Sequence, residues 1–165
     1  MSAKLKLTIH DARLRNLGAR SRKELSRVVT EAAAGVVAHA QDAIRSGPKT
    51  GRIYELGETE VSFTTGAGEA VSFTARKGAE AKQHQASAPG EAPANETGYL
   101  AGSIQAHRIG ELEQEVAVGA EYGAALEEGT GDGKILPRPF MAPALEAVRP
   151  AFEAAVADAL RRAAQ

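Results

Sequence analysis

Residues 21–44 read SRKELSRVVTEAAAGVVAHAQDAI, and no other stretch says as much about the fold. Its apolar side chains recur every three or four residues, as expected for a helix of about six turns with one buried face. These positions are Leu25, Val28, Val29, Ala32, Val36, Val37, Ala40 and Ile44. Ser21 and Glu24 have the Ser-x-x-Glu spacing of a capping box, which predicts that the helix starts there. Ser46-Gly47-Pro48 predicts its end, because proline cannot continue the hydrogen-bond ladder.

Five further segments predict regular secondary structure. Residues 3–10 alternate apolar and polar side chains, which predicts a strand with one buried face. Residues 99–109 and 112–118, separated by Gly110-Glu111, predict an antiparallel pair of strands. Residues 142–163 predict a final helix, with Pro143 tolerated in its first turn and Pro150 expected to kink it. Residues 122–128 predict one or two helical turns.

The middle of the chain, at about residues 55–98, differs in character, being rich in Gly, Pro, Ser, Thr, Ala and Glu. It contains the repeat Val61-Ser-Phe-Thr and Val71-Ser-Phe-Thr around the glycines of residues 65–68. We predict a β-hairpin with Val61, Phe63, Val71 and Phe73 on one face. Residues 77–95 lack periodicity and predict an extended loop. Both parts have little apolar surface of their own, so we expect them to become ordered against neighbouring subunits.

Composition narrows the function. The 165 residues suit one domain, and a chain with only 4% aromatic residues has a thin core that subunit contacts can supplement. The net charge of −1 argues against a dedicated nucleic-acid binder, and we expect no sequence-specific nucleic-acid binding. The chain has no cysteine, which excludes disulfides and thiolate metal sites. No apolar run approaches the ~20 residues of a membrane span, and no signal peptide is expected.

The residues that could carry chemistry favour structural roles. The four histidines, His10, His39, His84 and His107, lie in different predicted elements, so we expect neither a metal site nor a catalytic base. The acidic residues Glu127, Glu128 and Asp132 lack the alternate-position spacing of a calcium loop. We therefore expect no catalytic residues, no metal and no cofactor. A basic stretch is either a solvated face or a contact for an acidic partner or DNA in a pore: Arg13, Arg15, Arg20, Arg22, Lys23 and Arg27.

The last third contains Tyr122-Gly-Ala-Ala-Leu-Glu-Glu-Gly-Thr130 and then Pro137-Arg-Pro-Phe-Met-Ala-Pro-Ala-Leu-Glu146. A glycine-containing acidic turn thus precedes a proline-restricted entry into the last helix. This stretch resembles the signature of a family of small neck or tail-completion proteins of long-tailed bacteriophages. Three earlier segments extend the resemblance in the same order: residues 46–54, and then residues 84–93, which lead into residues 96–104. Residues 55–83 look inserted relative to that pattern.

The resemblance implies an α+β fold, in which an antiparallel sheet is packed by two long helices and a hairpin and long loop are inserted at about residues 55–98. It implies a structural protein of the virion neck, assembled in the bacterial host cytoplasm. Its partners would be copies of itself in a ring around the DNA channel, the head connector, and the tail terminator or tail tube. The assembly residues would be Glu127, Gly129, Thr130, Pro137, Arg138, Pro139 and Phe140. Of these, Phe140 and the prolines would anchor the last helix, and Glu127 and Gly129 would shape the turn.

Two other classes remain open from the sequence. A tail terminator is a neighbouring ring protein with a related α/β layout. A small enzyme or host binding module is the remaining class, and an enzyme would need a pocket with converging titratable groups.

Overall fold

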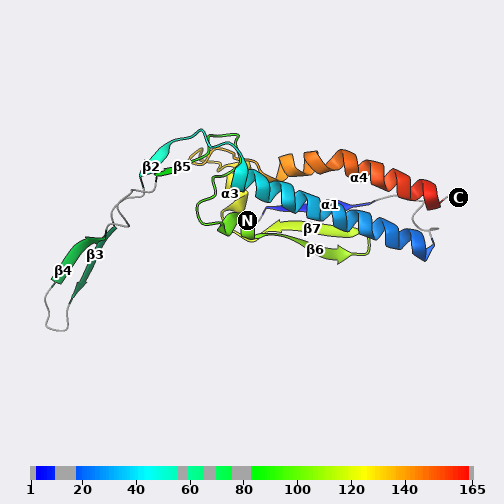
Figure 1. Ribbon diagram of the computed structural model, residues 1–165, viewed down its shortest axis with the longest axis horizontal. Coiled ribbons are helices and arrows are strands. Elements are labelled where there is room, and N and C mark those ends of the chain that lie inside the picture. The colour runs from blue at the N-terminus through cyan, green and yellow to red at the C-terminus, as the bar shows by residue number, and fades with distance from the viewer. Residues whose placement is uncertain (1–2, 10–17, 56–58, 65–69, 76–82, 164–165) are drawn as a thin grey trace.

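The computed structural model describes residues 3–9, 18–55, 59–64, 70–75 and 83–163. Its body contains a three-stranded sheet and two long helices, and an arm of paired strands extends from one end of that body (Figure 1). The fold is α+β, as the sequence predicts. The arm and the body come from one continuous chain, because the arm's residues lie between the first long helix and the second strand of the sheet.

The sheet has the strand order β1-β7-β6, and both pairings are antiparallel. Its strands are β1 (Lys4–Thr8), β6 (Ile104–Gly110) and β7 (Glu113–Val118). Alternation of side chains separates its two faces. One face contributes Leu7, Ile104, Val116 and Val118 to the core. The other face is charged, with ion pairs between Lys4 and Glu115 at 3.2 Å and between Lys6 and Glu113 at 2.8 Å.

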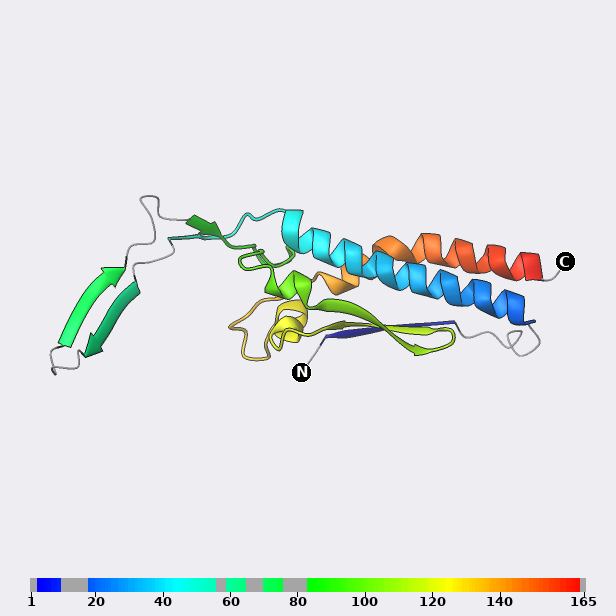
Figure 2. The same cartoon turned by 60° about the horizontal axis from the view of Figure 1, so that its bottom comes forward.

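The helix α1 (Ala19–Ser46) covers the apolar face of the sheet and contacts all three of its strands (Figure 2). Its buried side chains follow the predicted periodicity, except that Val37 is only partly buried: Leu25, Val28, Val29, Ala32, Ala33, Val36, Ala40 and Ile44. The predicted capping box is wrong. The N-cap is Gly18, three residues before Ser21, and no side chain caps the helix, so Ser21 lies inside the first turn. Glu24 instead pairs with Arg162 at 2.5 Å.

The last helix, α4 (Met141–Ala163), runs along α1 and continues through Pro150 (Figure 2). The approach is close, since a Cβ atom at Gly35 of α1 would lie 3.2 Å from the Cγ2 atom of Val148. Its buried residues are Met141, Ala144 and Ala159. Helix α4 packs mainly against α1, and α1 in turn packs against the sheet. The core is narrow and rich in small residues, as the composition predicts.

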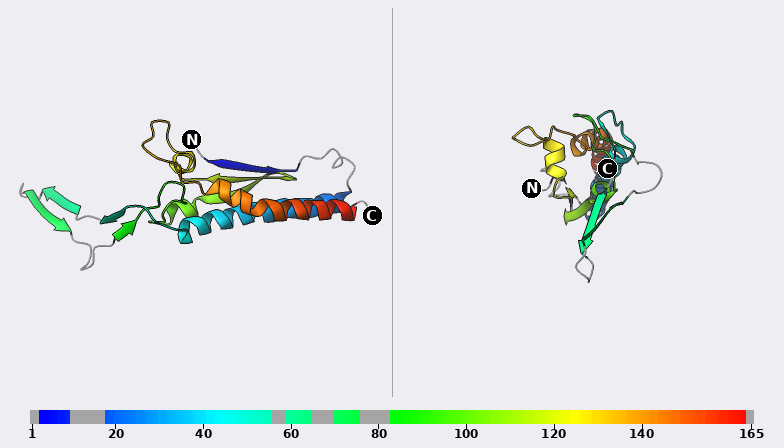
Figure 3. Two further views of the ribbon diagram at one scale, coloured as in Figure 1. Left: turned by 90° about the horizontal axis from the view of Figure 1, so that it is seen from above. Right: turned by 90° about the vertical axis from the view of Figure 1, so that its left-hand side faces the viewer.

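Two strand pairs form the arm (Figure 3). The strands β3 (Thr59–Thr64) and β4 (Ala70–Ala75) are antiparallel, and the register pairs Val61 with Phe73 and Phe63 with Val71. The backbone pairing of the predicted hairpin is thus confirmed, while its predicted turn at residues 65–68 lies outside the described residues. Nearer the body, β2 (Ile53–Glu55) pairs with β5 (Gln83–Gln85). The prediction of an extended loop over residues 77–95 is therefore wrong at β5, which is a paired strand.

The chain that leads into β6 also differs from the prediction. Residues 99–102, which the sequence predicts as strand, form one helical turn, α2 (Tyr99–Gly102), which buries Leu100 and Ala101. Gly98 has a φ of +79°, which reverses the chain before this turn. The Ser103 hydroxyl donates to the Leu100 carbonyl at 2.8 Å and closes it. The strand β6 then begins at Ile104, and the predicted pairing of β6 with β7 is confirmed.

Candidate functional site

The short helix α3 (Gly123–Glu128) places Glu127 opposite the first turn of α4. Its carboxylate accepts three backbone N–H groups, from Phe140 at 2.8 Å, Met141 at 2.9 Å and Ala142 at 2.9 Å. These amides have no partner within a helix, and a negative charge there also complements the helix dipole. Glu127 therefore fixes where α4 starts and how it lies relative to α3.

Gly129 ends α3 in a conformation reserved for glycine, with φ +79° and ψ −178°. A Cβ atom there would lie 2.8 Å from the carbonyl oxygen of Ile135 and 2.9 Å from the Cδ atom of Pro137. Thr130 then closes the loop, because its N–H donates to the Ile135 carbonyl at 2.9 Å and its hydroxyl accepts the Ile135 N–H at 3.0 Å. Gly129 and Thr130 thus hold the chain in the turn that the sequence predicts here.

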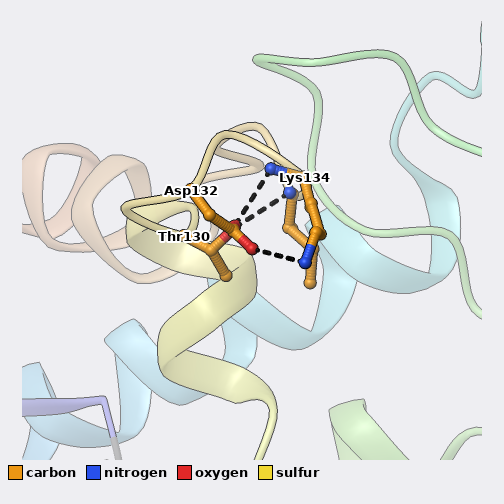
Figure 4. Close-up of polar contacts among 4 residues, drawn as sticks. Thr130, Asp132 and Lys134 are labelled. Carbon is orange, nitrogen blue, oxygen red and sulfur yellow. Dashed lines mark hydrogen bonds and ion pairs between the residues drawn. The ribbon is translucent and has the colours of Figure 1, made fainter.

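The tip of this loop is an exposed polar turn (Figure 4). The Thr130 hydroxyl donates to the Asp132 carboxylate at 2.6 Å, and the Lys134 N–H donates to the same oxygen at 3.2 Å. The Lys134 ammonium lies 3.0 Å from the other carboxylate oxygen. These hydrogen bonds, that from Thr130 foremost, lower the pKa of Asp132. Asp132 is occupied in shaping the turn, and its acceptors are used by its own loop.

Arg138 connects this loop to a second loop that precedes it by some fifty residues. Its N–H donates to the Leu126 carbonyl at 2.6 Å, and its guanidinium donates to the carbonyls of Ser87 at 3.3 Å and Leu136 at 3.3 Å. The Pro137 carbonyl accepts the Gly90 N–H at 2.9 Å. Ser87 is buried. Together, these hydrogen bonds join the loop before α4 to the loop at residues 87–90.

Phe140 follows this extended segment and has no exposed surface. It belongs to the core cluster together with Met141 and Ala144 of α4. Pro137 and Pro139 on either side of Arg138 remain partly or largely exposed, consistent with a role in restricting the backbone rather than in packing. The predicted anchoring of the last helix by Phe140 agrees with this burial.

Residues 50–51 also contact the loop at residues 87–91, and these contacts are not predicted from the sequence. The Glu91 carboxylate accepts the Thr50 N–H at 2.9 Å, the Thr50 hydroxyl at 2.5 Å and the Ala88 N–H at 2.8 Å. The Thr50 hydroxyl foremost, with these two N–H groups, lowers the pKa of Glu91. Gly51 approaches so closely that a Cβ atom there would lie 2.6 Å from the Ser87 carbonyl oxygen. The Thr-Gly step at residues 50–51 is the sequence signal that could have indicated this segment.

Lys49 joins this segment to the end of α1. Its ammonium donates to the carbonyls of Ala43 at 3.3 Å and Ala92 at 3.4 Å. Partial burial lowers the pKa of Lys49, and the charge of Glu91 opposes that shift. We name residues 49–51, 87–91, 127–130 and 137–142 the junction cluster, because hydrogen bonds or close contacts link these four segments.

Other predicted site residues lie elsewhere. Val61, Phe63, Val71 and Phe73 are in the arm hairpin, away from the junction cluster (Figure 1). Arg20, Lys23 and Arg27 line an open groove on α1 together with Arg108 of β6. Arg13, Arg15 and His10 lie outside the described residues. Among the residues that the structure describes, no three His, Asp or Glu side chains come close enough to hold a metal ion.

Comparison of the chain with profiles of known protein families, with curated proteins and with solved structures finds no match. In the described part of the chain, neither long helix is apolar enough to cross a membrane.

Proposed function

We propose that this chain is a structural protein of the head–tail junction of a long-tailed bacteriophage or a phage-like particle. It would form a homo-oligomeric ring that joins the head connector to the tail, and it would have no catalytic role. The proposal starts from the resemblance of residues 122–130 and 137–145 to the neck and tail-completion signature.

The observation that carries the proposal is the junction cluster. The segments that bear the resemblance are far apart in the sequence, yet Glu127 binds the start of α4, Arg138 binds the Ser87 carbonyl, and Gly51 lies against the Ser87 carbonyl. Four stretches that carry parts of the resemblance are therefore parts of one bonded unit. A unit of this kind sets the position of an arm relative to a body, which suits an assembly role more than a chemical one.

The arm gives further support. The strands β3 and β4 have extensive contacts, among the described elements, only with each other. A two-stranded hairpin alone is marginal in water, so a protein that keeps one gains stability when a neighbour covers it. A tail terminator ring would use the same features, and the position of the chain in a particle separates that alternative from a neck protein.

Disruption of the gene in the replicon that encodes the chain tests the proposal. The expected result is filled heads and finished tails that stay separate in electron micrographs, with joining restored when purified protein is added to the lysate. Normal numbers of joined particles from the disrupted replicon would contradict it. Complementation with Glu153→Ala, which changes an exposed residue of α4 outside the junction cluster, is the matched control and should restore joining.

A further inference from the structure

Two of the chain's seven aromatic side chains, which are three Tyr and four Phe, lie exposed and against each other. Tyr99 is 60% exposed, Tyr122 is 46% exposed, and their ring centroids are 6.4 Å apart. Exposed tyrosines are typical anchors of protein interfaces, because each offers a large rigid surface at a low entropic cost. In a chain with so few aromatic residues, two exposed tyrosines in contact indicate a surface that binds a partner.

Two carboxylates lie close to the tyrosines in the sequence. Glu121 directly precedes Tyr122, and Glu96 lies three residues before Tyr99. Both are exposed, and neither has a hydrogen bond or ion pair among the described residues. We name Glu96, Tyr99, Glu121 and Tyr122 the tyrosine–glutamate patch. Negative charge beside aromatic faces favours a cationic partner, since arginine and lysine bind both groups.

A surface of that chemistry lies on the same chain. An open groove between the first turns of α1 and strand β6 is lined by Arg20, Lys23, Arg27 and Arg108 and by two carboxylates. Those carboxylates are already engaged, since Glu31 pairs with Arg27 and Glu24 pairs with Arg162. Arg20 and Lys23 are exposed and have no ion pair among the described residues. We name Arg20, Lys23, Arg27 and Arg108 the arginine–lysine groove.

The two surfaces lie at opposite ends of the body. The patch residues lie at or within three residues of the starts of α2 and α3, which are at the end from which the arm extends, while the first turn of α1 and the β6–β7 turn lie at the other end (Figures 1 and 2). One copy therefore cannot bring its own patch to its own groove. Two different surfaces that are complementary generate a head-to-tail contact, which repeats into a closed ring or an open filament.

We propose that the tyrosine–glutamate patch of one copy binds the arginine–lysine groove of a second copy. The inference rests on the proposed role as a self-associating junction protein and names the surfaces that this role uses. Glu96 and Glu121 face Arg20 and Lys23, and the tyrosine pair provides the aromatic surface for an arginine. The contact is strongest at low ionic strength, because exposed charges are screened by salt.

Two charge reversals on the full chain test this contact. The patch variant is Glu96→Lys with Glu121→Lys, and the groove variant is Arg20→Glu with Lys23→Glu. The groove variant places acidic residues at the second and fifth positions of α1, close to its N-terminus, where the helix dipole favours them, so it should fold at least as well as the wild type. Glu153→Lys, an exposed position on α4, is the control for a change of charge elsewhere.

Mass photometry and sedimentation velocity at low and high salt give the readout. The wild type and Glu153→Lys should associate at low salt and dissociate as salt rises. Each reversed variant alone should weaken association at least about tenfold, since like charges then face each other. Mixing the two variants should restore association, because each then meets the opposite charge, and circular dichroism confirms that both are folded.

Two results would overturn the inference. One is that both reversed variants associate as the wild type does, which would leave the proposed junction role standing on contacts elsewhere. The other is a wild type that stays monomeric at low salt and high concentration. In either case the gene-disruption experiment still decides the junction role separately, because it measures joining in particles and not contact between purified copies.

Discussion

The carboxylate of Glu127 accepts the backbone N–H of Phe140 at 2.8 Å, so a side chain of the short helix α3 holds the backbone directly before the first residue of α4. Phe140 is itself fully buried. The Glu127 carboxylate therefore fixes the backbone at Phe140, while the Phe140 ring packs in the hydrophobic core.

Replacing Glu127 by Ala removes the acceptor for three N–H groups at the start of α4. We expect a loss of about 1–2 kcal/mol in the free energy of unfolding, as for other helix caps, and a fall in Tm of about 2–4 °C per kcal/mol. Glu127→Gln should lose less, since it retains one acceptor oxygen. The matched control is Glu128→Ala, which should lie within about 0.5 kcal/mol of wild type in urea unfolding.

Phe140→Ala should cost about 3–5 kcal/mol, because it removes a fully buried aromatic ring from a narrow core. Thermal melts measure this directly. Leu136→Ala changes a side chain that is 50% exposed and should alter Tm little. Equal Tm shifts for the two variants would mean that Phe140 does not anchor the last helix.

Gly129→Ala should destabilise the chain by about 1–3 kcal/mol, since the φ of +79° with ψ of −178° is essentially limited to glycine and the new Cβ atom meets Ile135 and Pro137. At Gly131, two residues later, an added Cβ atom would meet no other group within 4 Å. Gly131→Ala is therefore the control, and chemical denaturation should show it close to the wild type. A neutral Gly129→Ala would refute the close packing of this turn.

Stability should fall in acid partly through Glu91. Its hydrogen bonds to Thr50 and Ala88 lower its pKa in the folded state. A group with a lowered pKa stabilises the fold above its unfolded pKa of about 4.3, and that contribution disappears as the pH falls through the folded pKa. Melts from about pH 6 to pH 3 should therefore show a smaller acid loss for Glu91→Gln than for wild type. Glu153→Gln, at an exposed position, should keep the wild-type slope.

The backbone amides of β3 and β4 should exchange with solvent faster than those of β7. The hairpin strands have extensive contacts only with each other among the described elements, whereas β7 is the middle strand of the sheet under α1. Hydrogen exchange on the free chain and on assembled particles measures both. We expect protection of β3 and β4 to rise on assembly. Strong and equal protection in both states would show that the hairpin is stable without neighbours.

Long periodic elements could be predicted from the sequence, and short ones could not. The helix α1 carries one apolar face over 28 residues, so its pattern is unambiguous. The strand β5 has only the three residues Gln83–Gln85, with no apolar alternation, and its place depends on its pairing with β2. The helix α2 has four residues, too few to show a helical period.

The predicted assembly residues cover only two of the four segments of the junction cluster, residues 127–130 and 137–140, and none of the contacts between segments follows from the sequence pattern. Local spacing predicts Glu127 in a turn, because a capping side chain is expected within three residues of a helix start. Its carboxylate instead caps a helix 13 to 15 residues later. Likewise, the contact of Arg138 with Ser87 spans 51 residues. Such links depend on the tertiary fold, which periodicity and local spacing do not encode.

A cryo-electron microscopy map of the intact particle tests the proposed junction role most directly. We predict that the helix–sheet body fits a ring of density between the head connector and the tail, with each arm hairpin covered by a neighbouring subunit. Density for the chain only at the end of the tail tube would favour the tail terminator alternative. Particles that join head to tail without any copy of this chain would contradict the junction role.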